Sequence, residues 1–216
     1  MDSTKDTRDN FSADAGTVTP FPGHPAANLA RNQRQTHSYG LQPESGPLVA
    51  ELARTVHAAI KNCAPHGLSA AAKASLRGYL CEPELLNISH KEASDHTYRR
   101  HLLYAAEDRS FSILAIVWNP GQCTPIHGHT AWGAAGVHTG NPYCESFTNY
   151  ESAPQVLSLR SEMKMRLHPG DIATVEPGID DAHRIGNDTI SRCITVHVYG
   201  RDLLASPSSI NIVLNN

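Results

Sequence analysis

Three histidines in the C-terminal half of the chain have the type and spacing of metal ligands. His127 and His129 occupy alternate positions in the segment QCTPIHGHT, and His183 lies further along, in VEPGIDDAHRIGN. Side chains at positions i and i+2 of an extended strand leave the same face, so the first two imidazoles point into one space. Neutral imidazole is a common donor to catalytic transition metals. We therefore predict that the three histidines bind one metal ion.

The residues around these histidines are better evidence for metal binding than the number of histidines in the chain. The chain has 13 histidines, and a histidine in a strand is more often solvated or hydrogen-bonded than a ligand. Here both segments have a frame of turn-forming residues, which consists of Gly121, Gly140, Gly170, Pro177, Gly178 and Asn187. This frame resembles the two motifs of the cupin superfamily. The resemblance implies a mainly β fold, a cupin (jelly-roll) β-barrel, with the metal site inside it.

The residues after the HxH pair narrow the resemblance. Many cupins place a carboxylate ligand there, but residues 130–133 of this chain read TAWG and offer no acid. The three-histidine variant looks like the thiol dioxygenases, the group that contains cysteine dioxygenase and 3-mercaptopropionate dioxygenase. The resemblance runs from Tyr98 to Tyr199, about half of the chain. It implies Fe(II), with Ni(II) as an alternative, and O2 as a co-substrate that oxidises a small thiol to a sulfinic acid.

A small thiol acid also needs a group that holds its carboxylate. In YRRHLLYA, Arg100 aligns with the arginine that cysteine dioxygenases use for this purpose, and strand alternation sends Arg99 to the opposite face. A guanidinium group offers a two-pronged set of donors to a carboxylate. We assign Tyr98 and Trp132 to substrate binding together with Arg100. The alternative is that both arginines are surface side chains.

In CITVHVYG, three polar side chains share one strand face by the same period of two: Thr195, His197 and Tyr199. They resemble the Ser-His-Tyr relay of the thiol dioxygenases, with threonine in the place of serine. The resemblance implies that the Tyr199 hydroxyl contacts O2 or the substrate and that His197 orients it. The alternative is a half-buried aromatic strand with a structural hydrogen bond.

Two glycines depart from the pattern of the family. Gly133 stands where vertebrate-type cysteine dioxygenases carry a cysteine that is cross-linked to the tyrosine, so Tyr199 should be a free phenol. Gly128 replaces the usual aspartate between the metal histidines, a change that we expect to loosen the turn. These departures leave three alternatives to a cysteine dioxygenase. They are a cysteine-processing cupin oxygenase of specialised metabolism with a further-transformed product, a 3-mercaptopropionate or mercaptosuccinate dioxygenase, and a non-catalytic metal-binding cupin.

The hydrophobic patterns predict the elements that must position these residues. Apolar residues spaced by three and four predict a helix over 48–63, a second helix follows from Ser69, and a shorter one is indicated around 82–87. Short β-branched or apolar stretches then alternate with turns at 98–105, 111–118, 132–137, 156–161, 163–167, 171–175 and 193–199. We expect a flexible arm over residues 1–45, helices packed on the barrel over 46–96, and the barrel over 97–216.

Composition limits the partners and the location. Lys plus Arg number 18 against 21 for Asp plus Glu, which gives no electrostatic reason to expect nucleic acid or an anionic membrane. No apolar run approaches the roughly 20 residues that span a bilayer, the N-terminus shows no secretory signal, and the five scattered cysteines form no CxxC pair. We expect a cytoplasmic protein, a monomer or small homo-oligomer, whose partner is a small thiol amino acid or thiol acid.

Overall fold

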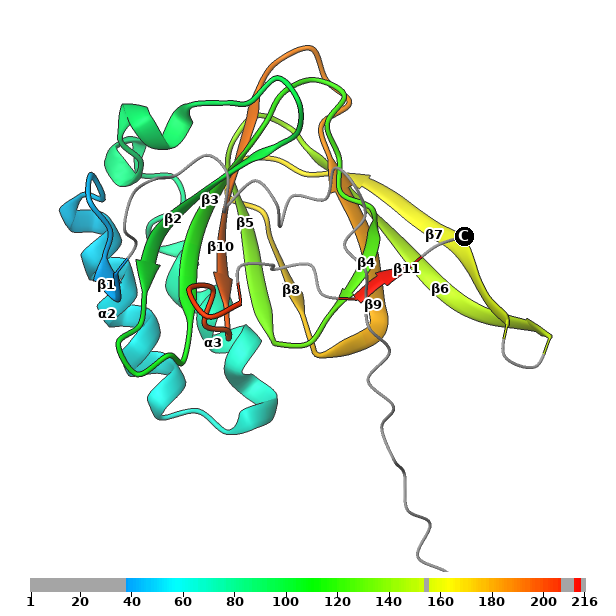
Figure 1. Cartoon of the computed structure of the whole chain (residues 1–216), viewed down its shortest axis with the longest axis horizontal. Helices are drawn as coiled ribbons and strands as arrows, with labels where there is room; N and C mark the ends of the chain where they lie inside the picture. Colours follow the sequence, from blue (N-terminus) through cyan, green and yellow to red (C-terminus); the bar gives the residue numbers. More distant parts are fainter. Residues whose placement is uncertain (1–37, 154–155, 207–211, 215–216) are drawn as a thin grey trace, which may run out of the picture.

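A computed structural model of the chain describes residues 38–153, 156–206 and 212–214, which form two antiparallel β-sheets with helices on one side (Figure 1). The helical elements are α2 (Pro47–Lys61), η1 (Pro65–Gly67), α3 (Leu68–Arg77), η2 (Pro83–Leu85) and η3 (Ile88–Lys91). The strands are β1 (Gly40–Leu41), β2 (Arg99–Ala105), β3 (Ser112–Trp118), β4 (Ile126–His129), β5 (Gly133–Thr139), β6 (Tyr143–Ala153), β7 (Val156–Arg166), β8 (Ile172–Val175), β9 (Gly178–Gly186), β10 (Cys193–Tyr199) and β11 (Ile212–Leu214).

The strand order identifies the architecture. Sheet A has the order β1-β2-β3-β10-β5-β8, and sheet B has the order β11-β4-β9-β6-β7. The eight strands from β3 to β10 divide between the sheets so that β3-β10-β5-β8 faces β4-β9-β6-β7. This interleaving of two Greek keys is the jelly roll, which cupins share with viral capsid and lectin domains. The predicted mainly β jelly-roll barrel with N-terminal helices is therefore confirmed.

The central strands of sheet A are buried on both faces. Every residue of β3 and of β10 is buried. On the outer face, Val196 and Val198 of β10 belong to the same apolar cluster as Leu76 of α3 and Leu52 of α2. The alternate residues of β10, among them His197, face the other sheet. This fully buried strand therefore carries its polar side chains only on the face toward the barrel interior.

The two predicted helices are present with slightly different bounds. The apolar stripe of α2 is buried, and α3 lies against β5, where a Cβ on Gly136 would come within 3.2 Å of the Leu76 side chain. The shorter predicted helix exists as the 3-10 turn η2. The helices cover the outer face of sheet A and leave its inner face to the barrel (Figure 1).

Some elements differ from the sequence prediction. The two stretches predicted as separate strands, 156–161 and 163–167, form the single long strand β7, because β6 pairs with it along most of its length. Strands β6 and β11 were not predicted. Residues 1–37 of the expected flexible arm lie outside the described residues, but Gly40 and Leu41 pair with Ala105 and Tyr104 of β2 as a short edge strand.

No helix in the described ranges combines the length and the apolar character needed to cross a bilayer.

Two buried histidines tie the segment before β2 to sheet A. His90 of η3 and His101 of β2 are 5% and 4% exposed, with ring centroids 6.0 Å apart. His101 Nε2 lies 2.9 Å from the Glu92 carbonyl, whereas Nδ1 of His90 has no hydrogen-bond partner among the described residues. Burial, reinforced by the charge of His101, lowers the pKa of His90 to about 4.

We predict that this pair makes the fold acid-sensitive. The unfolded chain takes up the proton near pH 6.5 and the folded chain only near pH 4, so the free energy of unfolding should be unaffected above pH 6.5 and decrease between these values. His90→Phe should reduce that decrease in urea-unfolding measurements at pH 5 and pH 8. The same change at the exposed His66 serves as the control, and equal acid sensitivity of both variants would contradict the assignment.

Candidate metal centre and its cavity

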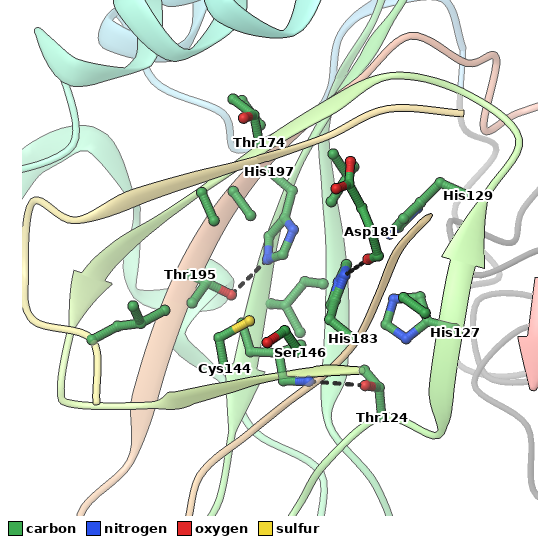
Figure 2. A pocket seen from close by; sticks show the side chains of 18 of the residues that line it. Thr124, His127, His129, Cys144, Ser146, Thr174, Asp181, His183, Thr195 and His197 are labelled. Carbon is green, nitrogen blue, oxygen red and sulfur yellow. Dashed lines mark hydrogen bonds between the residues drawn. The ribbon is translucent and has the colours of Figure 1, made fainter. Parts of the chain in front are cut away.

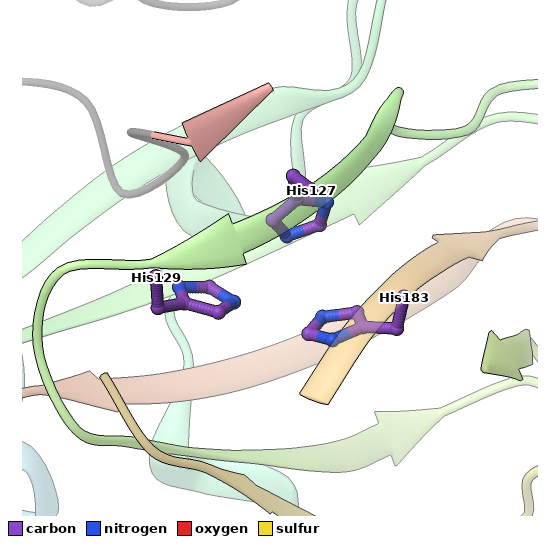
Figure 3. A group of neighbouring side chains, drawn as sticks. All are labelled: His127, His129 and His183. Carbon is purple, nitrogen blue, oxygen red and sulfur yellow. The ribbon is translucent and has the colours of Figure 1, made fainter. Parts of the chain in front are cut away.

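Strands β4 and β9 bring the three predicted ligands together (Figure 3). His127 pairs directly with His183 across the two strands, and His129 follows on the same face of β4. The ring centroids of His127 lie 4.9 Å from His129 and 4.5 Å from His183, and those of His129 and His183 are 5.2 Å apart. One nitrogen of each ring lies within 4.8 Å of the other two. The HxH spacing and the pairing of β4 with β9 thus bring the three imidazoles to one place.

Backbone carbonyls fix the orientation of two of the rings. Nδ1 of His127 lies 3.0 Å from the Pro125 carbonyl, and Nδ1 of His183 lies 2.8 Å from the Asp181 carbonyl. A carbonyl only accepts, so each Nδ1 carries the proton and each Nε2 keeps its lone pair. Burial is the largest influence on both rings and lowers the pKa of His127 and of His183, which favours the neutral form that coordinates metals.

The donor set fits a metal ion. Three nitrogens that bind the same side of one ion at about 2.1 Å lie about 3.0–3.4 Å from one another. The nitrogens of the three rings, which all lie within 4.8 Å of one another, need to close by at most about 1.8 Å. Three neutral imidazoles on one side of an ion leave its remaining positions open to the cavity, which is the arrangement of a catalytic site and not of a closed structural one.

A close backbone contact sets the distance between β4 and β9. The pairing is irregular between His127 and His129, and a Cβ on Gly128 would lie 2.3 Å from the Gly178 carbonyl oxygen. Gly178 itself has φ +131°, a conformation that L-residues with side chains rarely adopt. The expectation that Gly128 loosens the turn is therefore wrong: its missing side chain lets the two ligand-bearing strands approach.

A line of hydrogen bonds leads along β10 from the barrel wall to the centre. The Trp118 indole N–H donates to Thr195 Oγ1 at 2.9 Å, Thr195 Oγ1 lies 2.7 Å from His197 Nε2, and His197 Nδ1 lies 3.0 Å from the Tyr199 hydroxyl. The Tyr199 ring stacks 5.7 Å from the ring of His129. The three residues predicted from the period of two are thus joined in one line next to the ligands.

The direction of this line follows from its donors. The Trp118 N–H can only donate, and within the described residues Thr195 has no acceptor for its own hydrogen except His197 Nε2. Burial lowers the pKa of His197 to about 3, so the ring is neutral and its single proton lies on Nδ1. His197 therefore donates to the Tyr199 oxygen.

Arg100 and Tyr98 lie on the interior face of β2, as alternation predicts. Arg100 is only 7% exposed, and its charge acts on Tyr98, Tyr199 and His197. Burial lowers the pKa of Arg100 and raises that of Tyr98. The Tyr98 hydroxyl has no hydrogen-bond partner among the described residues. Arg99 points the other way and forms an ion pair with Glu92 at 3.1 Å.

Trp132 differs from expectation. It lies outside the central cavity, in a shallow surface pocket that it shares with His57 and Asp108, and its indole ring covers Gly200. The connection between β4 and β5 turns its side chain to the outside of the barrel. In contrast, Trp118, which sequence reasoning did not select, lines the cavity and begins the hydrogen-bond line. The period of two along β3 was the signal that could have identified it.

A cavity of about 280 Å³ lies between the sheets, next to the three histidines and the hydrogen-bond line. His127, His129 and His183 line it from sheet B, while Tyr98, Thr195, His197 and Tyr199 line it from sheet A. Figure 2 shows His183 and His197 directed into the same space from strands of different sheets. Cys144 and Ser146 of β6 also line it, and burial raises the pKa of the Cys144 thiol to about 11.

No protein-family model matches the chain. Among solved structures, it is similar to an uncharacterised conserved protein with a double-stranded β-helix domain from Klebsiella pneumoniae, at 16% identity over 62% of this chain and 100% of that one, with a TM-score of 0.43. A cupin 2 conserved barrel domain protein from Salinispora arenicola matches at 20% identity over 53% and 83% of the chains, with a TM-score of 0.37.

The cupin-2 domain of an XRE family transcriptional regulator from Enterobacter cloacae matches at 13% identity over 48% of this chain and 95% of that one, with a TM-score of 0.35. These TM-scores lie below 0.5. The fold assignment therefore rests on the strand order of this chain, and the candidate activity rests on its cavity.

We predict that Gly128→Ala weakens metal binding by about 10–100-fold, the range found when the support of metal ligands is disturbed. The added methyl group collides with the Gly178 carbonyl and separates His129 from His183. Titration with Fe(II), Ni(II) or Zn(II) measures the affinity. Gly78→Ala is the matched control, because a Cβ there makes only an ordinary 3.9 Å contact. Equal affinities of the two variants would contradict the role of the glycine pair.

Proposed function

We propose that this protein is a mononuclear non-haem iron dioxygenase that oxidises the sulfur of L-cysteine or a closely related thiol acid. One observation carries the proposal: three imidazoles, with no acidic residue of the described ranges in their group, line the same cavity as the Thr195–His197–Tyr199 line. A protein that only stores a metal has no need of the second group. A non-catalytic metal-binding role would therefore leave the Thr195–His197–Tyr199 line unexplained.

The proposed reaction adds both atoms of O2 to the sulfur. A thiolate RS⁻ and O2 give RSO2⁻: two sulfur–oxygen bonds form, the O–O bond breaks, sulfur loses four electrons and the two oxygen atoms gain them. Iron(II) held by three neutral imidazoles would supply open coordination positions and a positive charge that favours the thiolate and O2 together. Nickel(II) is the alternative metal, since imidazole donors suit both ions.

Arg100 and Tyr98 are the groups that we expect to hold the carboxylate of the substrate. The Arg100 guanidinium is buried beside Tyr98 and Tyr199, where its charge attracts an anion more strongly than at the surface. Arg201, the nearest arginine after β10, instead donates to the Thr130 and Ser206 hydroxyls. Anion binding at Arg100 favours cysteine over 3-mercaptopropionate, whose dioxygenases carry the arginine after the final strand.

Tyr199 is the group that we expect to contact the reacting oxygen or the substrate. Its oxygen accepts the His197 proton, and this polarises the hydroxyl so that its own hydrogen is a better donor. Thr195 and Trp118 fix the tautomer of His197 from the far side of the ring. They are positioning residues, and they act on the reaction through His197.

The decisive experiment combines metal analysis, O2 uptake and product identification. The protein is purified anaerobically, loaded with Fe(II) or Ni(II), and supplied with cysteine, 3-mercaptopropionate or mercaptosuccinate. We expect O2 uptake in the iron form with cysteine, and a product heavier by two oxygen atoms in mass spectrometry. A product altered beyond the sulfinate would favour the alternative of specialised metabolism. Absence of O2 uptake with every thiol at full iron load would overturn the proposal.

We predict that Arg100→Ala raises KM for cysteine by about 10–100-fold, the worth of a hydrogen-bonded charge, while metal content stays unchanged. Steady-state O2 uptake measures the first quantity and elemental analysis the second. Arg99→Ala, on the opposite face of the same strand, removes the same charge outside the cavity and should be silent. His183→Ala should instead abolish metal retention. A kinetically silent Arg100→Ala would show that the carboxylate clamp is misassigned.

We predict that Gly133→Ala impairs turnover without loss of metal. A Cβ at this position would lie 2.7 Å from Cδ1 of the Tyr199 ring, so the ring must move away from His129 and His197. Because the glycine carries no sulfur, residue 133 cannot form a thioether with Tyr199. The expected result is a fall in kcat of at least about tenfold with an unchanged metal content, as for a misplaced catalytic group. Unchanged kcat would remove Tyr199 from the reaction.

A further inference from the structure

The cavity has two chemically different ends. Toward β2, it is lined by Tyr98, with Arg100 buried next to it. Toward β5 and β8, strand register identifies the residues that share the inner face: Ala135 lies opposite His197, and Ala173 lies opposite Ala135. The sheet order β2-β3-β10-β5-β8 places these two ends on opposite sides of the strand that carries His197. One end is thus polar and cationic, and the other is apolar.

The apolar end is built from small side chains. We call it the apolar arm and define it by Ala135, Val137, Leu167, Ala173 and Val175, all of which line the cavity. Ala173 is exposed, so the arm reaches the surface at the edge strand β8. Burial of an alkyl group there would remove apolar surface from water on both sides of the contact.

The size of the cavity exceeds what cysteine requires. By the measure in which a single water needs roughly 10–15 Å³, the cavity of about 280 Å³ has room for far more than the seven non-hydrogen atoms of cysteine. A substrate held by its sulfur at the histidines and by its carboxylate at Arg100 would leave the apolar arm empty. Apolar space of this kind is usually filled by an apolar part of the ligand.

The charges around the cavity restrict what enters the arm. Glu162, Asp180 and Asp181 are exposed and line the cavity. No lysine or arginine of the described residues lines it directly, and Arg100 is buried next to Tyr98 at the other end. A second carboxylate in the arm would face these acids without a cationic partner. The arm therefore suits an uncharged substituent, while the single anionic group of the substrate lies at the Arg100 end.

We propose that the substrate is a mercapto acid with an apolar substituent on its sulfur-bearing carbon, which occupies the arm while the carboxylate lies toward Arg100 and Tyr98. This inference rests on the proposed thiol oxidation and specifies the class of thiol. In cysteine and 3-mercaptopropionate the same carbon carries only hydrogen, so both are truncated forms of the preferred substrate.

A series of 3-mercapto acids tests the inference. 3-Mercaptopropionate, 3-mercaptobutyrate and 3-mercaptohexanoate keep the distance between sulfur and carboxylate and carry hydrogen, methyl and propyl on the sulfur-bearing carbon. Mercaptosuccinate carries a carboxylate there. Dissociation constants are measured anaerobically by calorimetry on the iron-loaded protein, and kcat/KM by O2 uptake. We expect about fourfold tighter binding for each added methylene, and weaker binding of mercaptosuccinate than of 3-mercaptobutyrate.

Variants locate the substituent. Ala135→Leu fills the arm and should remove the gain in affinity from the methyl to the propyl substituent. Ala173→Leu, on the exposed edge strand, tests the same point if the first variant fails to fold. Thr139→Leu, at the exposed end of β5 and outside the cavity, is the control.

The outcomes separate the two proposals. Turnover of the short thiols with no gain along the series, or a gain that survives both leucine variants, would overturn the apolar arm alone. Absence of binding and O2 uptake with all thiols would overturn the proposed function and this inference with it.

Discussion

The site depends on how closely β4 approaches β9. Two of the ligands lie on one strand and the third lies opposite on its neighbour, so the separation of the strands is also the separation of the ligands. At Gly128 the strands meet at a distance that admits no Cβ, because the Gly178 carbonyl occupies that space. A glycine pair thus sets the spacing of the candidate metal ligands without contributing a donor atom. The remaining parts of the cavity, which face this centre from sheet A, are arranged around it.

The sequence predicted side-chain directions best in strands whose polar and apolar residues alternate. The period of two identified the shared faces of His127 with His129, and of Thr195, His197 and Tyr199, and it separated Arg100 from Arg99. The order of the strands, and with it the pairing of His127 with His183, depends on contacts between residues far apart in the chain. The jelly roll could be predicted only through resemblance, because alternation along one strand says nothing about its neighbour.

Other features had no signal in a single sequence. The carbonyls of Pro125 and Asp181 orient two ligands, and any residue type could supply them. Gly128 was expected to loosen the turn but instead allows β4 and β9 to approach closely. A glycine is compatible with either a flexible backbone or a close contact, and the two can be distinguished only when the neighbouring strand is known. Strand β6 was missed because it lacks an apolar alternation, and its Glu145 instead contacts side chains of both neighbouring strands, Ser161 of β7 and Arg184 of β9. Trp132 was assigned to the site because it follows the HxH pair closely in sequence. The turn before β5 instead directs its side chain outward.

The site residues are divided between the two sheets, and this has a consequence for stability. All three metal ligands belong to sheet B, while the Thr195–His197–Tyr199 line and Arg100 belong to sheet A, whose outer face is held by α2 and α3. Under the proposed function, metal retention would depend on one sheet, and reactivity would depend on the gap between the two sheets. On warming, a small increase in the spacing of the layers would uncouple them. On heating, such a barrel should then lose activity first in a form that still holds its ion, but in which the Thr195–His197–Tyr199 line and Arg100 are no longer aligned with that ion.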